Sequence, residues 1–64
     1  MTLDEKIDFI TKNLPEDYES FIEDYFYNTK LKCFVFYVKG KVLDAQVKLC
    51  RIDLPFEYRV FPMK

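Results

Sequence analysis

The run of six apolar residues from Cys33 to Val38 constrains this chain more than any other feature of its sequence. A half-buried strand alternates apolar and polar side chains, whereas a strand that is apolar at every position has two faces to bury. A chain of 64 residues buries only about 60% of the surface that its unfolded state exposes, so few other elements are free to cover both faces. The run therefore predicts a strand that contacts something outside its own fold.

The aromatic content explains how so short a chain can still form a core. Seven Phe and five Tyr make up 19% of the residues, and half of all residues are hydrophobic. Each buried aromatic side chain removes about 150 to 250 Å² from water, so we do not expect disorder. We expect one domain that spans residues 1–64.

The first half of the sequence predicts two helices. Thr2 and Glu5 have the spacing of a capping box, and an apolar stripe with the period of a helix follows, which predicts a helix over Leu3–Asn13. Pro15 ends that helix and suits the first position of a second one. The second helix has a broad apolar stripe of its own and is expected to end near Asn28.

The second half predicts three strands. Lys30–Val38 is rich in aromatic and β-branched residues and Lys41–Ile52 alternates, so these segments predict a β-hairpin with its turn at Gly40. Phe56–Phe61 alternates again and predicts a shorter edge strand, which Pro62 ends. The expected fold is α+β, with two N-terminal helices packed on one face of a three-stranded antiparallel sheet.

The loop at Gly40 decides which face of the first strand is buried. A two-residue loop turns Phe34, Phe36 and Val38 toward the helices, and a three-residue loop inverts the assignment. We favour the two-residue loop because it buries the larger phenylalanines. The predicted partner or dimer interface is then the stripe on the other face: Leu31, Cys33, Val35, Tyr37 and Val42. The alternative is that the C-terminal segment, residues 56–63, crosses over this stripe and shields it.

The net charge of −1 hides an uneven distribution. Residues 1–29 carry eight acids and two bases (net −6), and residues 30–64 carry eight bases and three acids (net +5). One explanation of this uneven distribution is that two oppositely charged elements pack together. Another is that one charged end of the molecule attracts and orients a binding partner. An acidic surface on the second predicted helix is an alternative site that would approach a basic partner, as a mimic of nucleic acid does: Glu16, Asp17, Glu19, Glu23, Asp24 and Tyr27. The plainer interpretation is a solvated helix face.

The sequence holds no motif of catalysis or metal binding. It has no His, its only serine (Ser20) lies among acids, and Cys33 and Cys50 lack the spacing of a metal site. In the predicted hairpin these two cysteines lie too far apart for a disulfide, so we expect free thiols. Gly40 is the only glycine, which argues against a phosphate-binding loop. We therefore expect no enzymatic activity, no metal and no cofactor.

Binding of nucleic acid through a basic, aromatic sheet face is the main alternative function. Aromatic side chains stack on bases, while lysine and arginine hold phosphates. The residues that would form this surface are Lys32, Lys39, Lys41, Lys48, Arg51 and Arg59. The net negative charge and the lack of a glycine-aromatic motif argue against it.

A small protein–protein interaction module is the interpretation that the sequence favours. Such a chain would act as a regulator or inhibitor by occupying a partner's surface, and a homodimer is one form it could take. Chains of this size without a cofactor often have such roles, including those that phages and mobile elements encode. The acidic N-terminus is not typical of a signal peptide, and the longest apolar run is far too short to span a membrane. We expect a cytoplasmic protein with no membrane partner.

Overall fold

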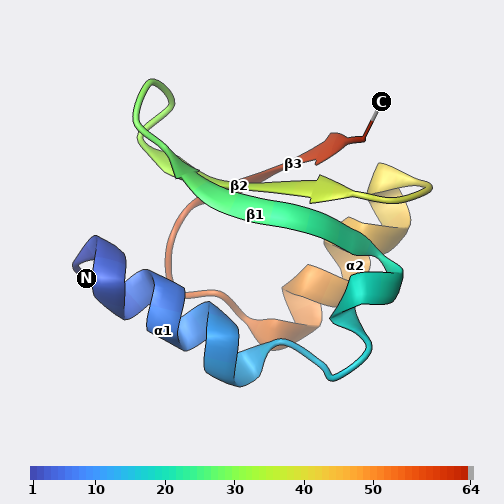
Figure 1. The fold of residues 1–64 in the computed structure, drawn as a ribbon, viewed down its shortest axis with the longest axis horizontal. Coiled ribbons are helices and arrows are strands. Elements are labelled where there is room, and N and C mark those ends of the chain that lie inside the picture. Colours follow the sequence, from blue (N-terminus) through green and yellow to red (C-terminus); the bar gives the residue numbers. More distant parts are fainter. Residues whose placement is uncertain (64) are drawn as a thin grey trace.

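The computed structural model describes residues 1–63, which form two helices and a three-stranded sheet. The elements in chain order are α1 (Leu3–Asn13), the 3-10 turn η1 (Tyr18–Ser20), β1 (Ile22–Asn28), β2 (Cys33–Val38), α2 (Val42–Ile52) and β3 (Tyr58–Pro62). The strand order is β1-β2-β3, so β2 is central. Both helices lie on the same side of the sheet (Figure 1).

The predicted arrangement of two N-terminal helices followed by three antiparallel strands is wrong. Residues 15–28 form η1 and β1 instead of a second helix, and residues 41–52, predicted to be a strand, contain α2. β1 pairs with β2 in antiparallel fashion, whereas β2 and β3 are parallel. Parallel neighbours need a long crossover between them, and α2 provides it. The first helix is confirmed. A C-terminal edge strand is also present, but β3 begins at Tyr58 and not at Phe56, and it includes Pro62.

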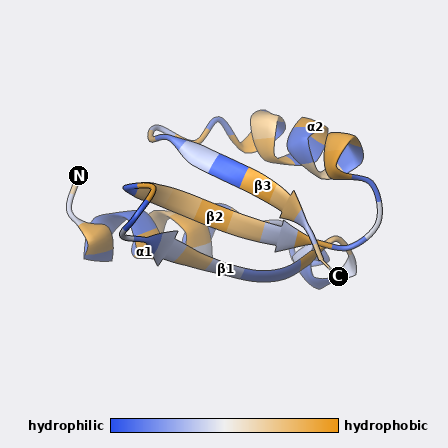
Figure 2. Cartoon of the chain, turned by 90° about the horizontal axis from the view of Figure 1, so that it is seen from above, coloured by the Kyte–Doolittle hydropathy of each residue, from blue (hydrophilic) through white to orange (hydrophobic). Residues whose placement is uncertain are grey.

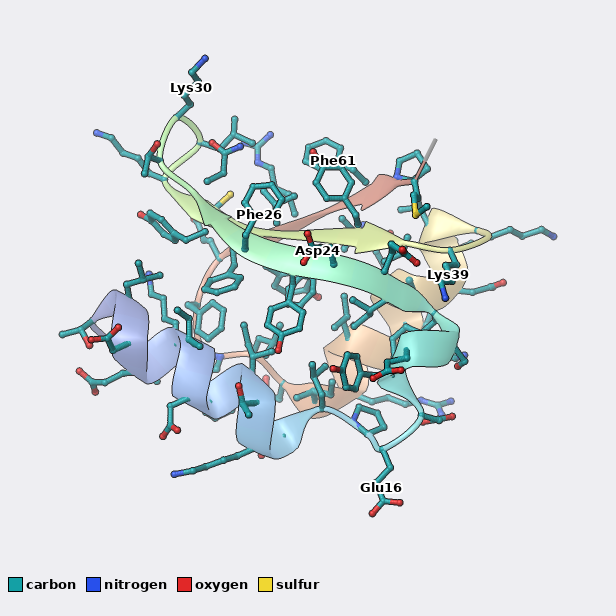
Figure 3. The ribbon with its side chains drawn as sticks, viewed as in Figure 1. Glu16, Asp24, Phe26, Lys30, Lys39 and Phe61 are labelled. Carbon is teal, nitrogen blue, oxygen red and sulfur yellow. The ribbon has the colours of Figure 1, made fainter. Side chains whose placement is uncertain are left out.

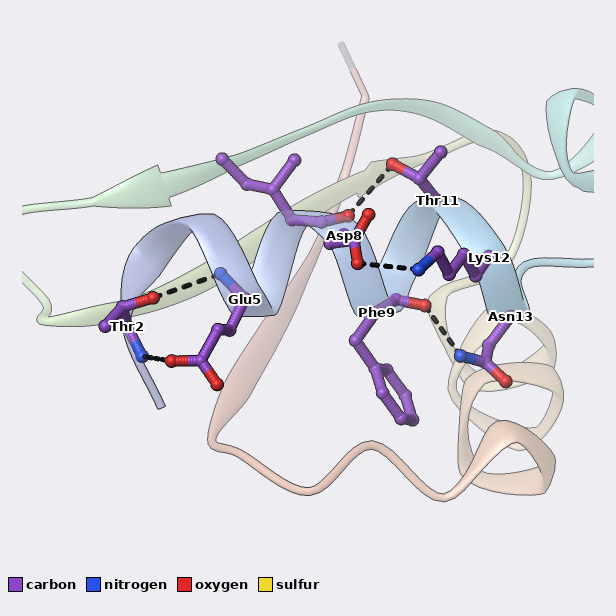
Figure 4. Close-up of polar contacts among 8 residues, drawn as sticks. Thr2, Glu5, Asp8, Phe9, Thr11, Lys12 and Asn13 are labelled. Carbon is purple, nitrogen blue, oxygen red and sulfur yellow. Dashed lines mark hydrogen bonds and ion pairs between the residues drawn. The ribbon is translucent and has the colours of Figure 1, made fainter.

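The N-terminus of α1 carries the predicted capping box. Thr2 Oγ1 accepts a hydrogen bond from the Glu5 N–H at 3.2 Å, and the Thr2 N–H donates to Glu5 Oε1 at 3.2 Å (Figure 4). Further along, the Lys12 ammonium forms an ion pair with Asp8 at 2.9 Å. Local side-chain contacts therefore define this helix, and its Ile10 is fully buried.

The capping box makes stability depend on pH in a defined direction. The Thr2 N–H and then the Thr2 hydroxyl lower the pKa of Glu5 in the folded chain. The unfolded chain therefore binds more protons than the folded one near the ordinary pKa of Glu5, and stability from this contact is lost as pH falls through the lowered pKa. We expect Glu5→Gln to flatten the acid side of the stability curve, measured by urea unfolding at a series of pH values.

A matched control for this prediction is Glu16→Gln, because Glu16 lies in the loop between α1 and η1. That variant should keep the wild-type dependence on pH. Parallel stability curves for Glu5→Gln and wild type over the acid range would contradict the role of the capping box.

Thr2→Ala removes the hydroxyl that accepts a hydrogen bond from the Glu5 N–H, and it should lower the free energy of unfolding by about 1 kcal/mol at neutral pH.

The hydrophobic core lies between the sheet and the two helices. Its buried members are Ile10, Phe21, Ile22, Phe34, Phe36, Val38, Ala45 and Leu49. The predicted burial of the three β2 residues in this list is thus confirmed, although neither of the two hairpin loops exists. Gly40, with a φ of +74°, lies instead in the turn that leads into α2, and the Lys39 N–H donates to the Phe21 carbonyl at 2.9 Å.

Each helix is 11 residues long. A helix that spans a bilayer needs about 20 predominantly apolar residues. Within residues 1–63, neither helix has the length and apolar character to cross a membrane.

Candidate protein-binding face of the sheet

The two faces of β2 have different surroundings. Successive side chains of a strand point to opposite faces, and Phe34, Phe36 and Val38 belong to the core beneath the sheet. Cys33, Val35 and Tyr37 therefore point to the other face, on which no helix of residues 1–63 lies. We call this side of the sheet the open face. Figure 2 looks onto it and shows most of β2 in the hydrophobic colour.

Three aromatic side chains, one from each strand, contact each other on the open face. The Phe26 ring of β1 stacks on Tyr37 of β2 with centroids 5.6 Å apart, and Tyr37 lies 6.1 Å from Phe61 of β3. Figure 3 shows Phe26 and Phe61 on the same side of the ribbon. Phe26 is 38% exposed, Phe61 is 36% exposed and Tyr37 is half-buried. We call these three residues the aromatic ladder.

Side chains of the flanking strands cover the middle of the open face. Val35 has no exposed surface although neither α1 nor α2 covers it, and Cys33 is 3% exposed. Phe26 on β1 and Arg59 on β3 are the register partners of Val35, so their side chains lie on either side of it. β2 is apolar on both faces because it is the central strand of the sheet and its neighbours bury it. The apolar surface that stays exposed on the open face belongs to the aromatic ladder.

Charges of both signs surround the ladder. Asp24 pairs with Tyr37 across β1 and β2, and its carboxylate accepts a hydrogen bond from the Tyr25 N–H at 2.8 Å. Arg59 follows on the opposite edge strand, and Lys30 and Lys32 lie in the turn between β1 and β2. The open face therefore has an apolar centre with a rim of mixed charge.

The predicted interface residues are only partly brought together. Cys33, Val35 and Tyr37 lie on the open face, which is the side predicted for them with a two-residue loop. Leu31 lies in the adjoining turn, with 40% of its surface exposed. Val42 does not belong to this face, because it starts α2 and packs against the core beneath the sheet. The C-terminal segment does not cross over the stripe; it forms β3 beside β2.

Sequence reasoning missed Phe26 and Phe61, which are the most exposed members of the ladder. Phe26 was assigned to the apolar stripe of a helix that does not exist. A signal for Phe61 was present, since it alternates with Tyr58 and Val60 and so had to face away from them. Phe61 contributes to the ladder because β3 pairs with β2, which brings it beside Tyr37.

The predicted acidic surface is not a helix face. Glu16 and Asp17 lie in the loop before η1, Glu19 is in η1, and Glu23 and Asp24 are in β1. The Lys39 ammonium partly neutralises the group, through an ion pair with Glu23 at 3.4 Å and a hydrogen bond to the Glu19 carbonyl at 3.1 Å.

Tyr27, the last member of that predicted surface, lies apart from the acids. It packs against the core beneath the sheet, with its ring 6.1 Å from Phe34. The Lys6 ammonium lies 5.4 Å from the centre of the Tyr27 ring. The acidic residues and Tyr27 therefore do not form one surface.

The six residues of the predicted nucleic-acid surface are also separated. Lys39 and Lys41 lie in the connection after β2, while Lys48 and Arg51 are on α2, on the helix side of the sheet. The Lys48 ammonium lies over the Phe21 ring, 4.6 Å from its centre. Of the six, Arg59 lies on the open face and Lys32 lies in the turn at its end.

The two cysteines are free thiols, as the sequence predicted. Cys33 is buried on the open face and Cys50 is exposed on α2. Burial, with a smaller contribution from the charge of the nearby Cys50, raises the pKa of Tyr58. No group of three or more His, Cys, Asp or Glu side chains within residues 1–63 is placed to hold a metal ion.

Comparisons of the chain with models of protein families, with curated proteins and with solved structures found no match. The geometry described above is therefore the basis for a functional proposal.

Proposed function

We propose that this chain is a small protein-binding module that acts as a regulator or inhibitor by laying its open face on the surface of another protein. The observation that carries the proposal is the aromatic ladder of Phe26, Tyr37 and Phe61, which crosses all three strands on a face that no helix of residues 1–63 covers. Aromatic residues dominate the binding energy of protein interfaces because each removes a large apolar area from water.

The ladder is held in place before any partner arrives. Its side chains project from paired strands, and Tyr37 contacts both of the other rings. Little side-chain entropy is then lost on binding, which favours affinity. Asp24 on one side and Arg59 on the other supply the polar rim that surrounds the apolar centre of protein interfaces.

Single-stranded nucleic acid is the competing ligand, since exposed aromatic rings on a sheet also stack on bases. Such binding needs a positively charged track beside the rings. Here Asp24 lies next to the ladder, and four of the six predicted basic residues lie off the open face. The charge distribution therefore favours a protein partner.

Substitution of the ladder tests this proposal. We expect Phe26→Ala/Phe61→Ala to remain folded by circular dichroism and to lose a partner protein that the immobilised wild-type chain captures from lysate of the source cells. The matched control is Leu43→Ala/Val47→Ala on the exposed side of α2, where these residues are 68% and 48% exposed. A hot-spot residue worth about 2 kcal/mol corresponds to about 30-fold in affinity, so loss of both should weaken binding by about 700-fold.

The outcomes that would contradict the proposal are distinct. A captured protein retained equally by the ladder variant and the control variant would not bind through the open face. Single-stranded oligonucleotides that bind wild type at low salt, dissociate as salt is raised and fail to bind the ladder variant would assign the face to nucleic acid.

A further inference from the structure

The two edge strands of the sheet differ in how well they are protected from pairing with another chain. β3 has five residues and ends in Pro62, which lacks an N–H to donate, and Pro55 lies shortly before it. β1 has seven residues and contains no proline, and its irregularity is confined to the start, between Ile22 and Asp24. An edge strand of this length is a template for pairing with a further strand. β1 is therefore the edge to which another strand would add.

An apolar hollow lies between α1 and the free edge of β1. It has a volume of about 290 Å³, and its lining residues are Leu3, Ile7, Tyr25, Phe26, Tyr27 and Phe34. Leu3 is 44% exposed and Ile7 is 41% exposed, although both belong to the apolar stripe of α1. The N-terminal half of this helix thus presents apolar surface that residues 1–63 do not cover.

The charges along β1 change sign from one end to the other. Glu23 and Asp24 lie at its start, and Lys30 and Lys32 lie in the turn directly after its end. Two copies of this segment placed side by side in antiparallel fashion would bring the acidic end of each next to the basic end of the other. Parallel placement would put like charges together. The segment is therefore complementary to itself under a two-fold axis.

We propose that a second copy of this chain pairs with β1 through the free edge, antiparallel and about a two-fold axis. The two sheets would then join into one sheet of six strands, with all helices on one side. Leu3 and Ile7 of both copies would approach each other beneath the joined edges and cover their exposed surface. Both open faces would stay free on the other side, so the dimer does not depend on the protein-binding function proposed above.

The register that best satisfies the charges is centred on Tyr27. In it, Tyr27 and its two neighbours in β1 pair with the same residues of the other copy, and the start of β1 lies beside the turn that follows β1 in the other copy. It places Asp24 of each copy opposite Lys30 of the other, because the two positions lie equally far from Tyr27. Asn28 Oδ1 accepts hydrogen bonds from the backbone N–H groups of Lys30 and Leu31, both at 2.9 Å, which fixes the turn that carries Lys30. Figure 3 shows the Lys30 side chain extended outward from the tip of this turn.

Charge reversal provides a test that reports the pairing directly. Asp24→Lys places lysine opposite Lys30 at both ends of the dimer, and Lys30→Glu places glutamate opposite Asp24 at both ends. Each variant should weaken self-association at least about tenfold, as measured by size-exclusion chromatography with light scattering over a range of concentrations. In an equimolar mixture, the introduced lysine of one variant lies opposite the introduced glutamate of the other, and the unchanged Lys30 lies opposite the unchanged Asp24. The mixture should therefore restore the dimer.

The control is Asp44→Lys, which makes the same change of charge on the exposed surface of α2 and should dimerise like wild type. Circular dichroism confirms that each variant is folded. A wild-type chain that stays monomeric up to about 1 mM would overturn the proposal, because its dissociation constant would then lie above that of even a weak specific complex. Single variants that dimerise like wild type, or a mixture that stays monomeric, would overturn it as well.

Discussion

Phe36→Ala should remove a large part of the stability of the chain and strongly lower its midpoint of thermal unfolding. Phe36 has no exposed surface in the central strand, and its ring lies 6.0 Å from Tyr25, 6.1 Å from Phe34 and 5.8 Å from Tyr58. Truncation of a buried phenylalanine costs about 3 to 5 kcal/mol. At about 0.05 to 0.15 kcal/mol per residue, a chain of this length has about 3 to 10 kcal/mol of stability in total. Thermal unfolding followed by circular dichroism measures the effect.

Phe61→Ala is the matched control, because it is the same change on the neighbouring strand at a residue that is 36% exposed. It should unfold within a few degrees of wild type. A Phe36→Ala variant that melts as high as Phe61→Ala would show that β2 does not turn this side chain into the core.

Leu49→Ala should destabilise the chain far more than Leu43→Ala. In α2, Leu49 has no exposed surface and Leu43 is 68% exposed. The first change should cost about 2 to 5 kcal/mol and the second within about 0.5 kcal/mol. Urea unfolding of both variants gives the two free energies of unfolding.

This comparison also separates the observed fold from the predicted hairpin. A strand over these residues would put Leu43, Ala45, Val47 and Leu49 on one buried face, because side chains at alternate positions share a face. Leu43→Ala and Leu49→Ala would then both be strongly destabilising. Similar losses of stability in the two variants would contradict α2.

The segments that could be predicted from the sequence are those with local signals. α1 has a capping box at Thr2 and Glu5, and Pro15 follows shortly after its end, so its bounds are set by residues within the helix or beside it. β2 has no polar residue between Cys33 and Val38, which indicates burial on both faces whatever its neighbours are.

The segments that were predicted wrongly carry two periods at once. In α2, Leu43, Ala45, Val47 and Leu49 alternate like a strand, but Val42, Ala45, Leu49 and Ile52 also form a helical stripe, and it is this stripe that packs on the core. In β1, Tyr25 and Phe26 fit a helical stripe with Phe21 and Ile22, yet aromatic residues also favour strands. Tertiary packing selects the period, because β1 pairs with the edge of β2 while α2 covers the core and connects β2 to its parallel neighbour β3.

The candidate site could be predicted only in part for the same reason. The face of β2 that carries Tyr37 was assigned correctly from alternation and the size of the phenylalanines. The other two rings of the ladder, Phe26 and Phe61, come from strands whose positions depend on pairing with β2. Residues that meet through long-range pairing leave no fixed spacing in the sequence.

Hydroxyl-radical footprinting with mass spectrometry tests the central claim, which is that the open face is accessible and binds a partner. In the free chain at low concentration, we expect oxidation of Phe26, Tyr37 and Phe61 but not of Phe34 or Phe36. In the captured complex, the ladder should become protected while Leu43 continues to react. Oxidation of Phe34 and Phe36 with protection of the ladder in the free chain, or a ladder that stays reactive in the complex, would contradict the claim.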